Sequence, residues 1–228
     1  MTEQKPSSSQ EEHKLQYSWT LFYKPPVRSF KVAESNWMKL LQKIDTCNSL
    51  EDYFRFFLFV IIIIYCFSLY FNFIHSWKLY RMCASIPRPA FQPHKSILYF
   101  FRENIMPAWE DPANKGGGSL SLDLRNVDYS PFSELLFMSI SLLIIGNTLP
   151  KAYVINGVSF NKGNESIDLW VNAQVQKKEL INSLVNMLNP ILETYHGSPL
   201  TKDMFSFHLH AIKSWAYIYH FNYLFKLL

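Results

Sequence analysis

The sequence predicts an α+β protein in which helices back an antiparallel β-sheet. Segments with alternating apolar and polar residues indicate half-buried strands, and they are interspersed along the chain with stretches of helical spacing. The segment Asn161 to Asn164 has the composition of a hairpin turn between two such strands. Gln174 to Leu188 has the apolar stripe of an amphipathic helix. Strands and helices in this order pack as an α+β fold.

The elements are expected in the following places. Strands are expected at Leu15–Lys24, Ser96–Phe101, Ser119–Arg125, Tyr153–Phe160 and Ser166–Val171. Helices are expected to begin at the capping box Ser49–Asp52, to run from Pro131 to a stop at Gly146, and to run from Gln174 to a stop at Pro190. A short helical turn is expected after Trp37, at Met38 to Ile44.

Composition limits the class of protein. The 228 residues are enough for one domain with tails, and we expect residues 1–14 to form a disordered polar tail. A net charge of +4 is too small for strong nonspecific binding to nucleic acid, although it permits a local basic patch. The cysteines form no CxxC pair, which favours a reducing compartment.

A proline-bracketed loop from Ile105 to Gly118 places the indole of Trp109 beside the carboxylate of Glu110, directly before a predicted strand. This pair suits a flat cationic ligand, because the ring stacks on its face and the carboxylate accepts protons from its edge. The alternative is a tryptophan in the core and a glutamate in solvent.

Further residues of the same chemical kind lie on predicted loops or strand ends: Trp37, Trp170 and Lys162. Two indoles on opposing loops can sandwich one base, with about 1–3 kcal/mol for each stacked base, and a nearby lysine can meet a phosphate. No nucleophile elbow, P-loop or metal-ligand pattern is present, and His208-Leu-His210 lacks further ligands. We therefore expect a binding module without a cofactor or metal rather than an enzyme.

The residues around Trp109 resemble a motif of a known protein family. Met106 to Gly117, with Trp109-Glu110-Asp111 at its centre, closely resembles the cap-binding loop of the eukaryotic translation initiation factor 4E family. Other segments match the same family in the expected order: His13–Trp19, Ser49–Phe54, Leu143–Gly146 and Ile167–Trp170. The resemblance covers about Leu15 to Leu192, with one interruption, and predicts a cap-binding domain at residues 15–192.

The resemblance implies a curved sheet with helices on its convex face and a site for the 7-methylguanosine cap of mRNA. By this resemblance Trp37 and Trp109 sandwich the methylated base, and Glu110 accepts its N1 and N2 protons. Trp170 lies near the methyl group, and Lys162 contacts the phosphates. A cationic base strengthens both the stacking and the carboxylate contact. The implied function is translation initiation in the cytoplasm.

The chain departs from the family at the phosphate end. An apolar residue stands near Phe160 where the family has an arginine, and Ser119 and Ser166 replace other basic residues. We therefore expect weaker cap affinity with a shallower salt dependence.

The resemblance also implies a surface for partner proteins, either the initiation scaffold factor or 4E-binding repressor proteins. Phe54 stands where the family has a tryptophan, and Leu50 and Met138 flank it. Phenylalanine keeps the apolar contact but loses the indole N–H donor, so partner binding is expected to be reduced. A divergent cap-binding repressor that recruits no scaffold factor is therefore an alternative.

The run from Phe56 to Trp77 contains no formally charged residue and has the length and hydropathy of a membrane-spanning helix. Against the family pattern, residues 58–71 become an apolar insertion in the first helix. Three explanations compete: a membrane anchor at residues 56–74, a helix extension packed on its own chain, and translated intron sequence. We favour the last, because a span would separate Trp37 from Trp109. Residues 193–228 are expected to be an irregular, aromatic-rich tail.

Overall fold

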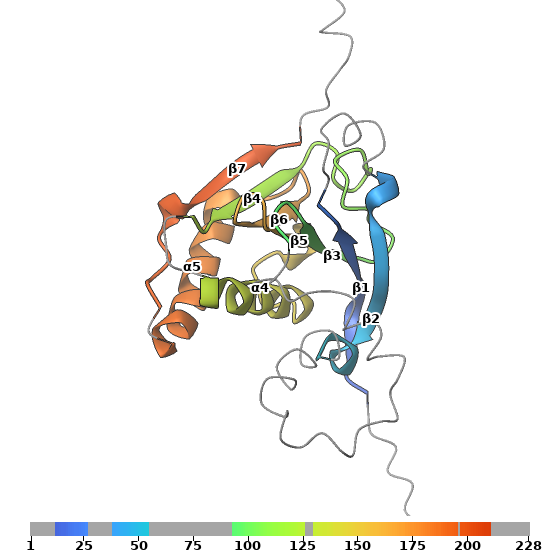
Figure 1. Cartoon of the computed structure of the whole chain (residues 1–228). Helices are drawn as coiled ribbons and strands as arrows, with labels where there is room; N and C mark the ends of the chain where they lie inside the picture. The colour runs from blue at the N-terminus through green and yellow to red at the C-terminus, as the bar shows by residue number, and fades with distance from the viewer. Residues whose placement is uncertain (1–11, 27–37, 55–92, 126–129, 196, 211–228) are drawn as a thin grey trace, which may run out of the picture.

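The computed structural model describes residues 12–26, 38–54, 93–125, 130–195 and 197–210 (Figure 1). Seven antiparallel strands form one sheet in the order β2-β1-β3-β5-β6-β4-β7. The strands are β1 (Lys14–Lys24), β2 (Gln42–Ser49), β3 (Ile97–Arg102), β4 (Gly118–Asp123), β5 (Ile155–Asn161), β6 (Ser166–Val171) and β7 (Phe205–Leu209). The helices α4 (Ser130–Ile145) and α5 (Lys177–Thr194) lie on the same side of the sheet (Figure 1). This architecture confirms the predicted α+β class.

Strict alternation along the strands separates two faces of the sheet. In β3, Leu98 and Phe100 join the main core, whereas Tyr99 and Phe101 belong to a separate apolar cluster. In β6, Leu169 joins the main core. The face opposite the helices, which carries Tyr99, Phe101 and Trp170, is called the second face below.

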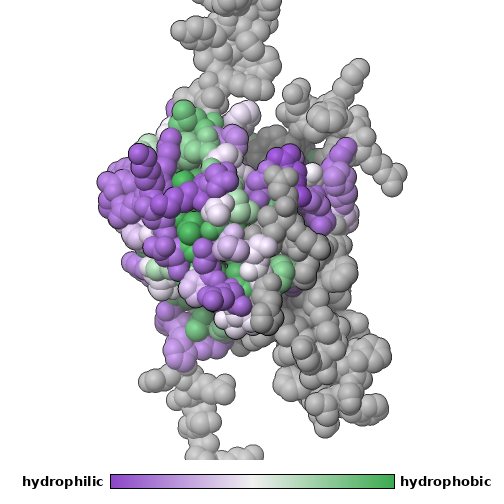
Figure 2. All heavy atoms as spheres, turned by 90° about the vertical axis from the view of Figure 1, so that its left-hand side faces the viewer, coloured by the Kyte–Doolittle hydropathy of each residue, from purple (hydrophilic) through white to green (hydrophobic). Residues whose placement is uncertain are grey.

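The main core lies between the sheet and the two helices. Trp19 stacks on Phe100 with ring centroids 5.4 Å apart, and both side chains are fully buried. The stripe of α5 that faces the core consists of Leu180, Leu184, Leu188 and Leu192, all buried. Figure 2 looks onto the α5 and β7 side, where hydrophilic residues predominate and hydrophobic residues form only small groups. The helix is therefore amphipathic, as predicted.

Several boundaries differ from the expectations. The helix α5 continues through Pro190 to Thr194, because burial of Leu192 beyond the proline outweighs the backbone hydrogen bond that the proline cannot donate. Only Met38 to Leu40 is helical in the predicted turn, and Gln42 to Ser49 forms β2 against the edge of β1. A further element, the η2 turn (Ala152–Val154), precedes β5.

The structure also adds a strand within the segment expected to be irregular. Phe205 to Leu209 form β7, which pairs with β4 and follows the short η3 turn (Lys202–Met204). The buried side chain of Phe205 and the partly buried Phe207 pack against the main core. Pairing with an edge strand therefore orders this aromatic segment.

The helical segment after β2 begins where the capping box predicts. The backbone N–H of Asp52 donates to Ser49 Oγ at 3.1 Å, and the helical residues are Leu50 to Phe54. The following apolar run lies in residues 55–92, outside the described residues, so the insertion at residues 58–71 stays a prediction. Within the described ranges, none of the helices combines the length and apolar character that a membrane crossing requires.

Candidate functional site

The loop that carries Trp109 is organised around the side chain of Asn114. This side chain is fully buried, at 0% exposure. Its Nδ2 donates to the carbonyl oxygens of Met106 at 2.9 Å and Ala108 at 2.8 Å, and its Oδ1 accepts from Nδ2 of Asn156 at 2.9 Å. One amide therefore joins the start of the loop to its end and to strand β5.

Asp111 closes the same loop from the other side. Its Oδ2 accepts from the backbone N–H of Met106 at 2.8 Å, and its Oδ1 accepts from that of Ala113 at 2.9 Å. The loop then leaves through Gly116, which has a φ of 74°, and Gly117, where an added Cβ would lie 2.0 Å from the carbonyl oxygen of Val171. The glycine run thus allows the loop backbone to approach β6.

Trp109 and Glu110 lie at the outer side of this fixed loop. The indole of Trp109 is 39% exposed, so it is not a core residue. Glu110 is exposed and forms no ion pair with any residue that the structure describes. The indole and the carboxylate are therefore both accessible on a loop whose backbone is held by buried polar side chains.

A small apolar cluster on the second face brings the candidate ligand-binding segments together. Phe22, Tyr99 and Phe101 form its buried centre. Leu41, Ile105 and Trp170 pack against it from three different parts of the chain. Leu41 follows Trp37 by four residues, and Ile105 precedes Trp109 by four. Trp37 itself lies outside the described residues, so its predicted role is not tested.

Trp170 is held on the second face by contacts on several sides. Its ring lies edge-on to Phe101, with centroids 5.4 Å apart, and its Nε1 donates to Ser159 Oγ at 3.2 Å. The ring of His210 lies 4.5 Å from the indole, and His210 Nδ1 is 3.2 Å from the carbonyl oxygen of Asn114. Burial lowers the pKa of His210, which favours the neutral ring. His210 therefore connects Trp170 to the Trp109 loop.

A polar cluster that no sequence motif indicates adjoins Trp170 on the second face. Ser121 Oγ donates to Asp168 Oδ1, and Ser159 Oγ lies 3.5 Å from Asp168 Oδ2. Burial raises the pKa of Asp168. The sequence does contain one indication of this cluster. Asp168 precedes Trp170 by two residues in a predicted strand, which places both side chains on one face of the sheet.

Lys162 lies in the tight turn between β5 and β6. Its backbone N–H donates to Ser96 O at 3.1 Å, and Asn161 Oδ1 accepts from the backbone N–H of Gly163 at 3.0 Å. The side chain of Phe160 is 2% exposed and points into the main core, whereas that of Ser159 lies on the second face. Ser159 is therefore the β5 residue beside Trp170 on the second face, whereas Phe160 faces the helices. The expected departure near Phe160 stays a prediction.

The predicted partner-binding residues lie on the helix side of the sheet. Leu50, Phe54 and Met138 are partly buried beside the main core, and the Tyr53 hydroxyl donates to the Met138 carbonyl oxygen at 3.1 Å. That hydrogen bond ties the segment containing Leu50 and Phe54 to α4. The structure therefore brings these residues to one region, while their role in binding a partner stays a prediction.

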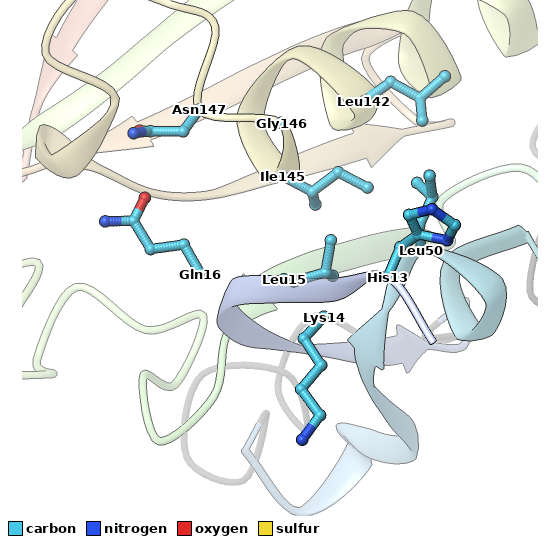
Figure 3. Close-up of a pocket in the computed structure, with 9 residues that line it drawn as sticks. All are labelled: His13, Lys14, Leu15, Gln16, Leu50, Leu142, Ile145, Gly146 and Asn147. Carbon is cyan, nitrogen blue, oxygen red and sulfur yellow. The ribbon is translucent and has the colours of Figure 1, made fainter. Parts of the chain in front are cut away.

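An open pocket adjoins Leu50. The lining residues come from the start of β1, the segment after β2 and the end of α4: His13, Lys14, Leu15, Gln16, Leu50, Leu142, Ile145, Gly146 and Asn147. In Figure 3 the side chains of Leu15 and Ile145 face each other in the middle, Leu50 lies beside His13, and Lys14 points away. The pocket thus has an apolar floor with polar groups at its rim.

No group of three or more histidine, cysteine, aspartate and glutamate side chains is arranged to hold a metal ion among the residues with a described position.

Comparison with known proteins gives a consistent result. The model of the family "Eukaryotic initiation factor 4E" matches residues 71–216, which is more than half of the chain. Translation initiation factor 4E of Saccharomyces cerevisiae is 28% identical over 165 residues, which cover 71% of this chain and 63% of the yeast protein. That of Candida glabrata is 29% identical over 164 residues, which cover 71% of this chain and 64% of that protein. The chain therefore spans somewhat less than two thirds of the length of these relatives.

Solved structures show the same fold. Ascaris suum eIF4E-3 in complex with an m7G cap has a TM-score of 0.59 at 19% identity, covering 90% of this chain and 94% of that one. Caenorhabditis elegans eIF4E-3 in complex with the 4E-binding protein Mextli has a TM-score of 0.59 at 18% identity, covering 88% of this chain and 94% of that one. The family is one of initiation factors and not of enzymes, which agrees with the prediction of a binding module. By the extent of the family match, the chain belongs to the eukaryotic translation initiation factor 4E family.

Proposed function

We propose that this chain binds the 7-methylguanosine cap of mRNA in the cytoplasm and acts in translation initiation, with the methylated base between Trp37 and Trp109 and against Glu110. The observation that supports it most is the apolar cluster on the second face. There Leu41 and Ile105, each four residues from one of the two tryptophans, pack with Trp170. A protein of the same fold, from Ascaris suum, was crystallised with an m7G cap.

The chemistry of Trp109 and Glu110 matches a cationic purine. Methylation at N7 gives the guanine ring a positive charge, which strengthens its attraction to the electron-rich face of an indole. A carboxylate next to that indole accepts the two edge protons in charge-assisted hydrogen bonds. Because Asn114 and Asp111 fix the loop backbone, the ligand does not have to order it on binding. Trp170 would then border the methyl group.

Lys162 is proposed to contact the phosphates. It lies at the end of the β5–β6 hairpin, and Trp170 lies at the other end of β6. A ligand that reaches both positions therefore runs along the strands on the second face. The contact is a point charge on a flexible side chain, so its loss should lower affinity without changing the preference for the methylated base.

The test is a titration of tryptophan fluorescence with 7-methyl-GTP and with GTP. We expect quenching by 7-methyl-GTP at lower concentration than by GTP. Glu110→Gln should abolish this preference, a loss of about tenfold or more for charge-assisted hydrogen bonds. Lys162→Ala should weaken both ligands similarly. Equal quenching by the two nucleotides in the unaltered protein would contradict the proposal.

Matched controls separate the site from general effects of charge. Glu103 is exposed at the start of the same connection, and Glu103→Gln removes the same charge at a position six residues before Trp109. Lys178 is exposed on α5, so Lys178→Ala controls for Lys162→Ala. Both control variants should keep the affinity of the unaltered protein for 7-methyl-GTP.

A second proposal concerns the helix side of the sheet. We infer that Leu50, Phe54 and Met138, together with the adjoining pocket, bind a short helical segment of the initiation scaffold factor or of a 4E-binding repressor protein. The partly buried apolar side chains and the apolar floor of the pocket support a helix-in-groove contact. The C. elegans protein of the same fold was crystallised with a 4E-binding protein.

A binding assay with a scaffold-factor peptide tests this surface and the alternative function. Binding that is lost in Phe54→Ala would support a role as an initiation factor. Cap binding without any scaffold binding would favour the alternative of a divergent cap-binding repressor. Because Phe54 lacks an indole N–H, we expect Phe54→Trp to strengthen peptide binding. Unchanged affinity in both variants would contradict the assignment of this surface.

A further inference from the structure

The register of four strands places a row of polar side chains across the second face. Ser159 of β5, Asp168 of β6, Ser121 of β4 and Ser206 of β7 are directly paired in turn. The next row toward the end of β6 contains Gly157, Trp170, Ser119 and His208. Asp168 is the one acid in these two rows, and it is two residues from Trp170 on the same face.

The carboxylate of Asp168 is held by hydroxyl groups and not by a cation. Ser121 Oγ donates to it, Ser159 Oγ lies 3.5 Å away, and no ion pair joins it to a described lysine or arginine. Burial raises its pKa, and hydrogen bonds from Ser121, Ser166 and Ser159 and the imidazole of His208 partly oppose this shift. The other titratable group that faces it is Tyr99 on β3.

Asp168 lies on the path between the two ends of the proposed ligand site. Trp170 and Asp168 are successive residues on one face of β6, so their side chains are about 7 Å apart along the strand. Ser166 follows at the same spacing, and the turn that contains Lys162 comes directly beyond. The straight path along β6 on the second face, from Trp170 to the turn that contains Lys162, therefore runs past the Asp168 carboxylate.

We propose that Asp168 determines specificity by disfavouring phosphate charge, so that the chain selects methylated guanine ligands with a short phosphate chain. This inference rests on the proposed cap-binding function. Phosphate oxygens that pass over a carboxylate meet a like charge at a partly desolvated surface, where the repulsion is weakly screened. A phosphate chain bound there therefore draws a proton onto Asp168.

Two consequences distinguish this arrangement from a neutral groove. First, each added phosphate gains little affinity, because attraction to Lys162 is offset by repulsion from Asp168. Second, binding of the triphosphate is accompanied by proton uptake at Asp168 and strengthens as the pH falls. A neutral isostere removes both effects while keeping hydrogen-bonding capacity toward Ser121 and Ser159.

The test titrates the protein with 7-methylguanosine and with its mono-, di- and triphosphate. In the unaltered protein the affinity should change little from the monophosphate to the triphosphate. Asp168→Asn should raise the affinity for the triphosphate on the order of tenfold, the effect of removing one like charge near a surface, and leave that for the nucleoside unchanged. Glu193→Gln, the same exchange at an exposed position of α5, should change neither.

Calorimetry in buffers of different ionisation enthalpy supplies a second readout. We expect the triphosphate to bind with more proton uptake in the unaltered protein than in Asp168→Asn, a comparison in which protons taken up by the phosphate itself cancel. If the variant does not fold, the phosphate series in the unaltered protein still tests the inference, because a steep rise in affinity from the monophosphate to the triphosphate would contradict it.

The outcomes separate the two claims. If affinity rises steeply with phosphate number in the unaltered protein and equally in Asp168→Asn, the role of Asp168 is overturned and cap binding stands. If folded protein binds none of the four methylated ligands, the proposed function is overturned, and this inference with it.

Discussion

The clearest structural prediction concerns Asn114, whose buried side chain closes the Trp109 loop. Replacement by alanine removes three hydrogen bonds: two donated to the carbonyl oxygens of Met106 and Ala108, and one accepted from Asn156. It removes no charge and leaves the side chains of Trp109 and Glu110 unaltered. Asn114→Ala therefore tests whether the geometry of the loop, rather than its side-chain chemistry alone, produces a ligand site.

The size of the effect follows from the number of bonds. A hydrogen bond contributes about 1 kcal/mol net to stability, so the three bonds of Asn114 give about 3 kcal/mol. The Asn156 amide is 4% exposed and keeps a bond to the Ala113 carbonyl oxygen at 2.7 Å, which limits the further cost. If the loss falls on loop opening, the closed loop becomes roughly 100-fold less favoured.

Three measurements check this prediction. Urea denaturation should show a free energy of unfolding lower by up to about 3 kcal/mol, and hydrogen exchange at Met106 and Ala113 should accelerate. Affinity for 7-methyl-GTP should fall as well. Asn182→Ala, an exposed change on α5, should leave all three close to the unaltered values. Unchanged exchange and affinity in Asn114→Ala would refute the reasoning.

Three further predictions concern the packing around the site. Tyr53→Phe should lower the free energy of unfolding by about 1 kcal/mol in urea denaturation, because the bond to the Met138 carbonyl oxygen is lost; an unchanged midpoint would contradict this. The folded state raises the pKa of Asp168, so its contribution to stability is present below the ordinary value of 3.8 and is lost as pH rises through the folded pKa. Asp168→Asn should remove this contribution to the pH dependence of the free energy of unfolding. Identical pH profiles for the variant and the unaltered protein would contradict a raised pKa of Asp168. Ser159→Ala removes the acceptor of the Trp170 indole N–H, so the resonance of this N–H should shift in a proton–nitrogen correlation spectrum. An unchanged resonance would contradict the hydrogen bond.

The sequence was most informative where structure depends on local alternation. In β6 the residues Ile167, Leu169 and Val171 are fully buried, as the alternating pattern predicts, and their neighbours lie on the second face. The pairing of β5 with β6 follows from the turn composition at Asn161 to Asn164. Both features are encoded by residues a few positions apart, so no knowledge of the rest of the chain is needed.

Elements that depend on distant partners were missed or misplaced. Most residues of β2 are polar, and their pattern does not indicate a strand. Pairing with β1 along Gln42 to Ser49 nevertheless provides hydrogen-bond partners for the backbone of β2. Apolar and polar residues alternate in β7, but its place at the edge of the sheet depends on pairing with β4, which lies some 85 residues earlier in the chain. Helix α5 passes Pro190 because Leu192 finds a buried position in the core. In each case tertiary contacts outweighed a local preference.

The same distinction applies to the candidate site. Trp109 and Glu110 were identifiable because a loop that pairs an indole with an acid is a local motif. The residues that hold them were not: Asn114 is joined to Asn156, 42 positions later, and to His210, 96 positions later. An asparagine or histidine in sequence gives no indication of such partners, because the hydrogen bonds exist only once the sheet has formed.

The two ends of the proposed site are supported by different parts of the structure, so substitutions can alter one end without altering the other. The base end depends on a loop held by Asn114, whereas Asp168 lies within a strand that is paired on both sides. A weakened loop should therefore lower affinity for every methylated ligand by the same factor, because all of them contain the base. Removing the Asp168 charge should change only the dependence on phosphate number. Preference for the phosphate chain can thus vary by single substitutions in β6 while recognition of the base stays intact.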